Sequence, residues 1–101
     1  MNVQEISLRT PVRAASSQIS SDLGGEVVIL DMKQSVYHGL DGAGARMWNL
    51  LQEGKTLEQV HQTILAEFDV PPETCEADLL NLVRELADSG LIEIIHELQG
   101  G

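Results

Sequence analysis

Aromatic residues and cysteines are scarce in this sequence. Trp48, Tyr37 and Phe68 are the only aromatic residues, although hydrophobic residues make up 43% of the chain. The core therefore has to be built mainly from leucine, isoleucine and valine. Cys75 is the single cysteine, so the sequence excludes an internal disulfide and a zinc site built on several cysteines. A lone cysteine is typical of a protein from a reducing compartment.

Basic residues are few. Six lysines and arginines stand against sixteen acidic residues, which gives a formal net charge of −10. Residues 41–101 carry three bases and twelve acids, and therefore −9 of this charge. Binding to a nucleic-acid duplex requires lysine and arginine against its phosphates, so this half would repel one. The charge leaves two interpretations open, which are solubility alone and attraction of a basic partner.

Long apolar runs are missing. No stretch approaches the roughly 18 apolar residues that a membrane-spanning helix needs. The N-terminal segment MNVQEISLRT lacks the basic start and the apolar stretch of a secretion signal. We therefore expect a cytoplasmic protein with no membrane segment.

The 101 residues have the length of one domain. Residues 1–11 are polar and end at Pro11, and we interpret them as an N-terminal arm. We predict a folded domain over residues 12–95 and a flexible tail over residues 96–101.

Strand patterns dominate the first part of the domain. Residues 12–21 alternate weakly and predict one strand. Residues 26–32 are a β-branched run, and residues 36–40 predict the next strand after a short turn that includes Ser35. The two segments together predict a β-hairpin.

Helical periodicity replaces this pattern after the hairpin. The first predicted helix covers residues 42–52, with Asp41 as its N-cap and Trp48 in the core. The second begins after Thr56, whose cap is reinforced by the nearby Glu58 and Gln59.

A third helix and a last strand complete the pattern. Pro72 suits the first turn of a helix that runs to Ser89, and Gly90 is a typical helix stop. Residues 91–95 predict a short final strand. The predicted fold is α+β: an N-terminal three-stranded antiparallel sheet, three helices and a short C-terminal strand. Three helices beside a hairpin also describe a winged helix-turn-helix.

No group of residues indicates catalysis. His38, His61 and His96 have no i, i+4 spacing for a metal, and Cys75 falls on the apolar stripe of the third helix. That position favours a buried structural thiol over a nucleophile. The sequence predicts a protein that is not an enzyme, with no catalytic residue, no metal ligand and no cofactor.

The hairpin has a possible open edge. No proline and no row of lysines blunts residues 36–40. An extended peptide could pair with this edge, a binding mode known as β-augmentation. Coverage of the edge by the N-terminal arm or by a second copy is the alternative, and the pattern alone leaves both open.

Several segments resemble the PqqD-like family in order. The resemblance covers residues 20–95, and these stretches carry it: Gly25-Glu26-Val27-Val28-Ile29-Leu30-Asp31, Tyr37-His38-Gly39-Leu40-Asp41, Gly44-Ala45-Arg46-Met47-Trp48-Asn49-Leu50-Leu51, Thr56-Leu57-Glu58-Gln59-Val60, Glu76-Ala77-Asp78-Leu79-Leu80 and Leu86-Ala87-Asp88-Ser89-Gly90-Leu91-Ile92. The resemblance implies a winged-helix-like recognition element for ribosomally made, post-translationally modified peptides. It implies that the leader segment of a precursor peptide adds as a strand beside the third strand, against the third helix.

Carried onto this chain, the resemblance places the strand part of the site at residues 35–40. Helical spacing suggests the helix part, and Glu76 and Asp78 are expected to meet a basic leader residue. The expected peptide-binding residues are Ser35, Val36, Tyr37, His38, Gly39, Leu40, Cys75, Glu76, Asp78, Leu79 and Leu82.

The chain looks most like the stand-alone leader-binding proteins of lasso-peptide pathways. Their partners are the precursor peptide, a leader-peptide protease and a cyclase. A chaperone of the pyrroloquinoline quinone precursor for a radical SAM enzyme is the close alternative. A winged-helix DNA regulator and a dimerising interaction module are the competing classes. We expect a monomer or a weak dimer.

Overall fold

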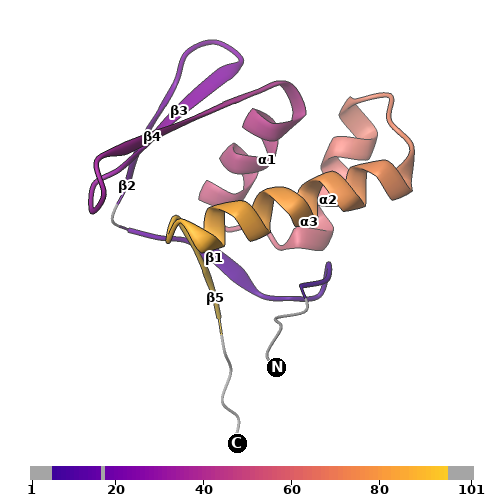
Figure 1. Ribbon diagram of the computed structural model, residues 1–101. Coiled ribbons are helices and arrows are strands. Elements are labelled where there is room, and N and C mark those ends of the chain that lie inside the picture. The colour runs from indigo at the N-terminus through magenta and orange to yellow at the C-terminus, as the bar shows by residue number, and fades with distance from the viewer. Residues whose placement is uncertain (1–5, 17, 96–101) are drawn as a thin grey trace, which may run out of the picture.

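The described part of the chain forms two small antiparallel sheets and three helices (Figure 1). The computed structural model describes residues 6–16 and 18–95. The first five residues of the predicted arm and the predicted tail 96–101 lie outside the described residues. The observed α+β class, with three helices and antiparallel sheets, agrees with the prediction.

The larger sheet has the strand order β2-β3-β4 and is antiparallel throughout. Its strands are β2 (Gln18–Asp22), β3 (Glu26–Asp31) and β4 (Val36–Asp41). In the central strand, Val27 and Ile29 are buried while Val28 and Leu30 are only partly covered. One face of this sheet therefore packs on the core. The predicted hairpin over residues 26–40 corresponds to β3 and β4.

The predicted strand over residues 12–21 is wrong in one respect. The segment forms two strands in different sheets, because β1 (Val12–Ala14) pairs with the C-terminal β5 (Ile92–Ile94), whereas β2 pairs with β3. The chain passes from the smaller sheet to the larger one after Ala15. This residue is buried and donates its N–H to the carbonyl of Leu91 over 2.9 Å. This bond extends the β1–β5 ribbon before the chain enters the larger sheet.

The helices are α1 (Gly42–Gln52), α2 (Leu57–Glu67) and α3 (Pro72–Asp88). The predicted cap of α2 is confirmed as a capping box, in which the Thr56 hydroxyl accepts from the Gln59 N–H and the Gln59 side chain accepts from the Thr56 N–H. Asp41 occupies the N-cap position of α1, but its side chain makes no capping hydrogen bond.

Strand β4 leads directly into α1, so Asp41 ends the strand and the helix starts at the next residue. Gly42 has a φ of +55°, a left-handed conformation that glycine adopts without steric cost. This junction fixes the start of α1 at the end of the edge strand.

The core lies between the helices and the covered face of the larger sheet. Trp48 is fully buried, as predicted, and Cys75 lies in the same cluster. The rest of the cluster is mostly aliphatic: Ile6, Val27, Ile29, Ala45, Met47, Leu50, Leu51, Leu57, Val60, Ile64, Leu79, Val83, Leu86, Leu91 and Ile92. Among the helices described, none combines the length and the apolar character that crossing a membrane requires.

Candidate peptide-binding edge and groove

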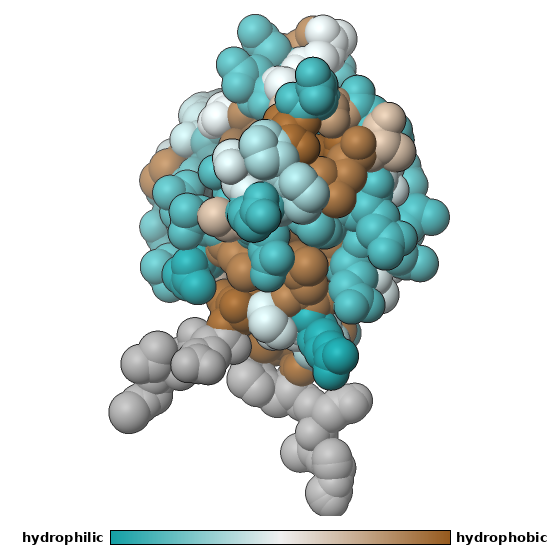
Figure 2. Space-filling model, turned by 90° about the vertical axis from the view of Figure 1, so that its right-hand side faces the viewer, coloured by the Kyte–Doolittle hydropathy of each residue, from teal (hydrophilic) through white to brown (hydrophobic). Residues whose placement is uncertain are grey.

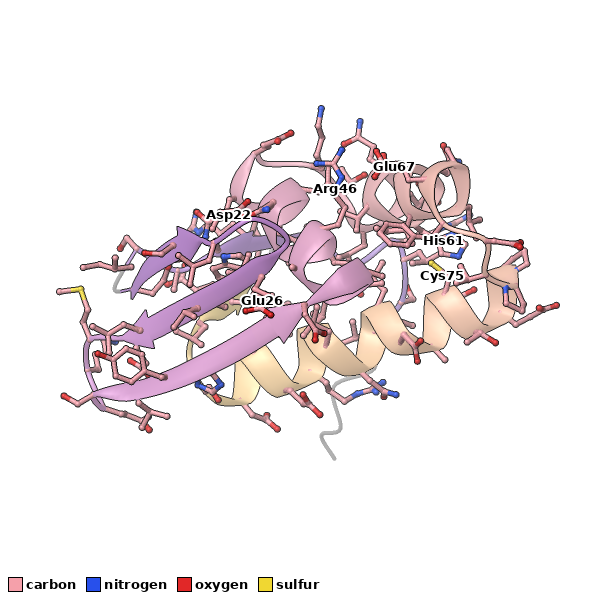
Figure 3. All side chains as sticks on the ribbon, turned by 90° about the horizontal axis from the view of Figure 1, so that it is seen from above. Asp22, Glu26, Arg46, His61, Glu67 and Cys75 are labelled. Atoms are coloured by element: carbon pink, nitrogen blue, oxygen red, sulfur yellow. The ribbon has the colours of Figure 1, made fainter. Side chains whose placement is uncertain are left out.

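Strand β4 is an edge strand. It pairs with β3 on one side, and no strand of the described residues pairs with its other side. Figure 3 shows β4 at the margin of the sheet, with α3 running nearby. Alternate residues of an antiparallel edge strand direct their N–H and C=O groups away from the neighbouring strand, so β4 presents unpaired backbone groups.

The side chains of β4 alternate between two environments. His38 and Leu40 are the cross-strand partners of the buried Ile29 and Val27, so they lie on the covered face and are partly buried. Tyr37 lies on the opposite face and is 68% exposed. An added strand would therefore have one face toward the helices and one toward solvent.

Five of the six exposed large hydrophobic side chains among the described residues lie on the hairpins of the larger sheet. Figure 2 looks onto the side where α2 meets α3, and its hydrophobic patches are separated by hydrophilic side chains. Leu65, Phe68 and Val70, near the α2–α3 connection, are only partly buried and pack on the core. The five on these hairpins are Ile19, Leu23, Met32, Val36 and Tyr37, and the sixth, Ile95, directly follows β5.

A groove opens between the start of α1 and the middle of α3, next to the end of β4. Its volume is about 310 Å³. Helix α1 contributes Ala43, Gly44 and Met47, and α3 contributes the residues of the other wall: Asp78, Asn81, Leu82 and Glu85. Because α1 follows β4 without a loop, the open edge and the groove adjoin each other.

The structure brings some of the predicted site residues together and separates others. Asp78 and Leu82 line the groove, and residues 36–40 lie in β4. Ser35 lies in the turn before β4, with a φ of 58°. Glu76 is partly buried and does not line the groove.

Cys75 and Leu79 belong to the core and not to the surface of α3. Their exposed fractions are 2% and 0%. Burial raises the pKa of the Cys75 thiol above its ordinary value, and the negative charge of Asp78 adds to this effect. The thiol is therefore protonated at neutral pH, which fits a structural residue.

Sequence reasoning missed five lining residues: Ala43, Gly44, Met47, Asn81 and Glu85. Helical spacing contained a signal for two of them, because Asn81 and Glu85 follow Asp78 by three and seven residues. The α1 residues gave no such signal, since only the tertiary packing places that helix across from α3. The described residues contain no group of three or more histidine, cysteine, aspartate or glutamate side chains that could hold a metal ion.

Comparison with known proteins places this geometry in a family. Residues 26–92 match the model of coenzyme PQQ synthesis protein D, PqqD. A solved structure described as TbiB1 in complex with the TbiA(beta) leader peptide is 36% identical, with a TM-score of 0.78, over 84% of this chain and 99% of that one. A second, lasso peptide synthetase B1 complexed with the leader peptide, shares the fold at 23% identity and a TM-score of 0.72, over 81% of this chain and 96% of that one. No curated protein sequence matches. Since the family model spans more than half of the sequence, the chain belongs to the PqqD family.

Proposed function

We propose that this chain binds the leader segment of a ribosomally made precursor peptide by strand addition at β4. The observation that carries the proposal is the unpaired edge of β4, which adjoins the groove between α1 and α3. An extended peptide gains main-chain hydrogen bonds from an open edge and side-chain specificity from adjoining pockets. The structure that is 36% identical holds a leader peptide, which supports the same ligand class here.

Binding would proceed by ordering a flexible segment. A free leader is disordered and loses conformational entropy when it pairs with β4. Apolar leader side chains that pack between β4 and α3 offset this loss. Each buried anchor contributes about 1.5–3 kcal/mol, so two or three anchors, less the ordering costs, give micromolar to nanomolar affinity.

The pathway in this proposal is lasso-peptide maturation. The chain presents the bound leader to a leader-peptide protease and then to a cyclase, and it has no catalytic role of its own. Both solved relatives are leader complexes, and the description of one names a lasso peptide synthetase, which supports this branch over the quinone-cofactor branch. The proposal places the protein in the cytoplasm as a monomer or weak dimer, with a winged helix-turn-helix-like fold.

Proline substitutions in β4 test the strand-addition mode. Tyr37→Pro and His38→Pro occupy adjacent positions, so one of them removes an outward N–H and the other removes an N–H that faces β3. The variant that lacks the outward donor is expected to fold and to lose at least about tenfold in affinity, which corresponds to about 1.4 kcal/mol. The probe is fluorescein-labelled TbiA(beta) leader peptide, measured by fluorescence polarisation, with circular dichroism to check folding.

The matched control is proline on the opposite edge. Ser20→Pro and Ser21→Pro change β2 in the same way, but β2 lies on the far side of β3. Whichever of these two β2 variants folds is expected to bind the probe with unchanged affinity. If Tyr37→Pro and His38→Pro both fold and both bind the probe as tightly as the unaltered chain, strand addition at β4 is wrong. Mass measurement in solution, with and without the peptide, adds a second test. A stable dimer that does not bind the peptide would show that a second copy of the chain covers the edge of β4.

A further inference from the structure

The groove combines an apolar floor with an acidic wall. Met47 is 3% exposed and Leu82 is partly buried, so hydrophobic atoms of both helices form its floor. On α3, Asp78 and Glu85 flank Leu82 by four and three residues, which puts all three on one side of the helix. The two acidic residues lie about 10.5 Å apart along the helix axis, at about 1.5 Å per residue.

Both carboxylates lack an internal counter-charge. Among residues 6–16 and 18–95, no side chain makes a salt bridge or a hydrogen bond to Asp78 or Glu85. No lysine or arginine lines the groove. The neighbouring Arg84 donates to the Asn81 side chain over 3.1 Å and is not part of the lining.

The other described arginines with side-chain partners lie elsewhere. Arg46 makes two hydrogen bonds to Glu67 on α2, and Arg13 pairs with Glu93 in the β1–β5 ribbon. The groove thus has two formal negative charges on its lining and no positive one. A ligand that supplies the missing cation is favoured by charge complementarity.

Lysine and arginine fit both properties of the groove. Their aliphatic stems cover apolar surface while their charged heads stay in water. We infer that the groove selects a leader in which a lysine or arginine crosses it, with the stem on Met47 and Leu82 and the cationic head beside Asp78 and Glu85. This inference rests on the proposed leader-binding function and specifies the chemistry of the leader.

A positional scan of the peptide tests the inference. Each residue of the TbiA(beta) leader peptide is replaced in turn by lysine and by glutamate, and affinities are measured by fluorescence polarisation at low and high salt. At one or two positions, the lysine peptide is expected to bind about tenfold more tightly than the glutamate peptide, because like charges repel and opposite charges attract across the groove. High salt should reduce this ratio.

Charge-neutral protein variants locate the effect. In D78N/E85Q, the lysine-to-glutamate ratio is expected to fall to about one at those positions, because the wall no longer carries charge. The matched control is E73Q/D88N, which changes two acids of the same helix that neither line the groove nor belong to the expected peptide-binding residues. It has the same net charge as the first variant, so it separates the local field of the groove from the overall charge of −10.

The outcomes distinguish the two proposals. A lysine-to-glutamate ratio that is lost in D78N/E85Q and kept in E73Q/D88N supports the inference. Binding with no preference for lysine, or a preference lost equally in both variants, overturns it and leaves leader binding intact. Absence of binding by every peptide, at every salt concentration, overturns the proposed function and this inference with it.

Discussion

The backbone N–H of Ser35 donates to the carbonyl oxygen of Asp31 over 2.7 Å, and this bond closes the turn between β3 and β4. Ser35 has a φ of 58°, and no other non-glycine residue in the described part of the chain has a positive φ. A residue with a Cβ atom is strained in this region. The residue that directly precedes the edge strand β4 therefore has a strained backbone conformation.

Replacing Ser35 with glycine is expected to stabilise the fold. The left-handed conformation costs an ordinary residue about 1–2 kcal/mol, and glycine avoids this cost. Glycine also makes the unfolded chain more flexible, which offsets about 0.4–1 kcal/mol of the gain. The expected net change is a gain of about 0–1.6 kcal/mol in the free energy of unfolding, measured by urea denaturation.

Gln34→Gly is the control for this prediction. Gln34 lies in the same turn but has no positive φ, so glycine there brings only the added flexibility of the unfolded chain. That variant is expected to lose about 0.4–1 kcal/mol. Loss of stability in both glycine variants would show that the backbone of Ser35 is not strained.

The carboxylate of Asp31 gives a second prediction. Asp31 is 2% exposed, and its Oδ1 accepts from the backbone N–H groups of Lys33 and Gln34 over 3.0 and 3.4 Å. Asp31→Ala leaves these groups without that acceptor and is expected to cost about 1–3 kcal/mol of unfolding free energy. Urea denaturation measures the loss.

Asp31→Asn is the informative comparison. Within the described residues, Oδ2 of Asp31 and Oε1 of Gln18 are both buried without a partner, and these two residues face each other across β2 and β3. An amide nitrogen in the place of Oδ2 removes one unpartnered acceptor and supplies a donor for the other, Oε1 of Gln18, while Oδ1 still accepts from the turn. The asparagine variant should therefore be at least as stable as the unaltered chain. A loss as large as that of Asp31→Ala would refute this account.

The cap of α2 gives a third prediction. Thr56→Ala removes the hydroxyl that accepts from the Gln59 N–H over 3.1 Å. The expected cost is about 1 kcal/mol in the free energy of unfolding, within the usual range for N-cap residues. Thr56→Ser keeps the hydroxyl and serves as the control, with an expected change of a few tenths of a kcal/mol. An equal loss in both variants would assign the effect to the methyl group and not to the cap.

The helices and the hairpin could be predicted from the sequence because their signals are local. The bounds of α1 follow from a switch in hydrophobic period, and α2 begins where Thr56 and Gln59 form the capping box. The division of residues 12–21 could not be predicted. It depends on the hydrogen bond from the Ala15 N–H to the Leu91 carbonyl, which joins distant parts of the chain. Such a contact produces no hydrophobic periodicity in the sequence.

The candidate site was predictable only in part, for a related reason. Helical spacing identified the apolar stripe of α3, but this helix has two adjacent stripes, one toward the core and one toward the groove. Leu82 lies on the border and belongs to both. Cys75 and Leu79 lie on the stripe that packs on the core, whereas Asp78 and Glu85 lie on the stripe that faces the groove. Periodicity places residues on a face of a helix, and only the packing of α1 and α2 determines which face stays open.

A last prediction concerns the ion pair between α1 and α2. Arg46 donates from Nε and one terminal nitrogen to the two carboxylate oxygens of Glu67, over 2.8 and 2.9 Å. These hydrogen bonds lower the pKa of Glu67 below its ordinary value of 4.5. A carboxylate with a lowered pKa stabilises the fold above the unfolded pKa, and this contribution disappears as the pH falls through the folded pKa.

A double-mutant cycle with Arg46→Gln and Glu67→Gln measures this contribution directly. The coupling free energy between the two positions is expected to be favourable at pH 7 and to vanish below the folded pKa of Glu67, because protonation leaves Arg46 without its counter-charge. Both side chains are more than one third exposed, so added salt should also weaken the coupling at neutral pH.

The same variants test whether the ion pair also holds α1 in place across from α3, because Arg46 immediately precedes the groove residue Met47. If it does, leader affinity in the single variants should fall along with the coupling; unchanged affinity would confine the role of the pair to stability.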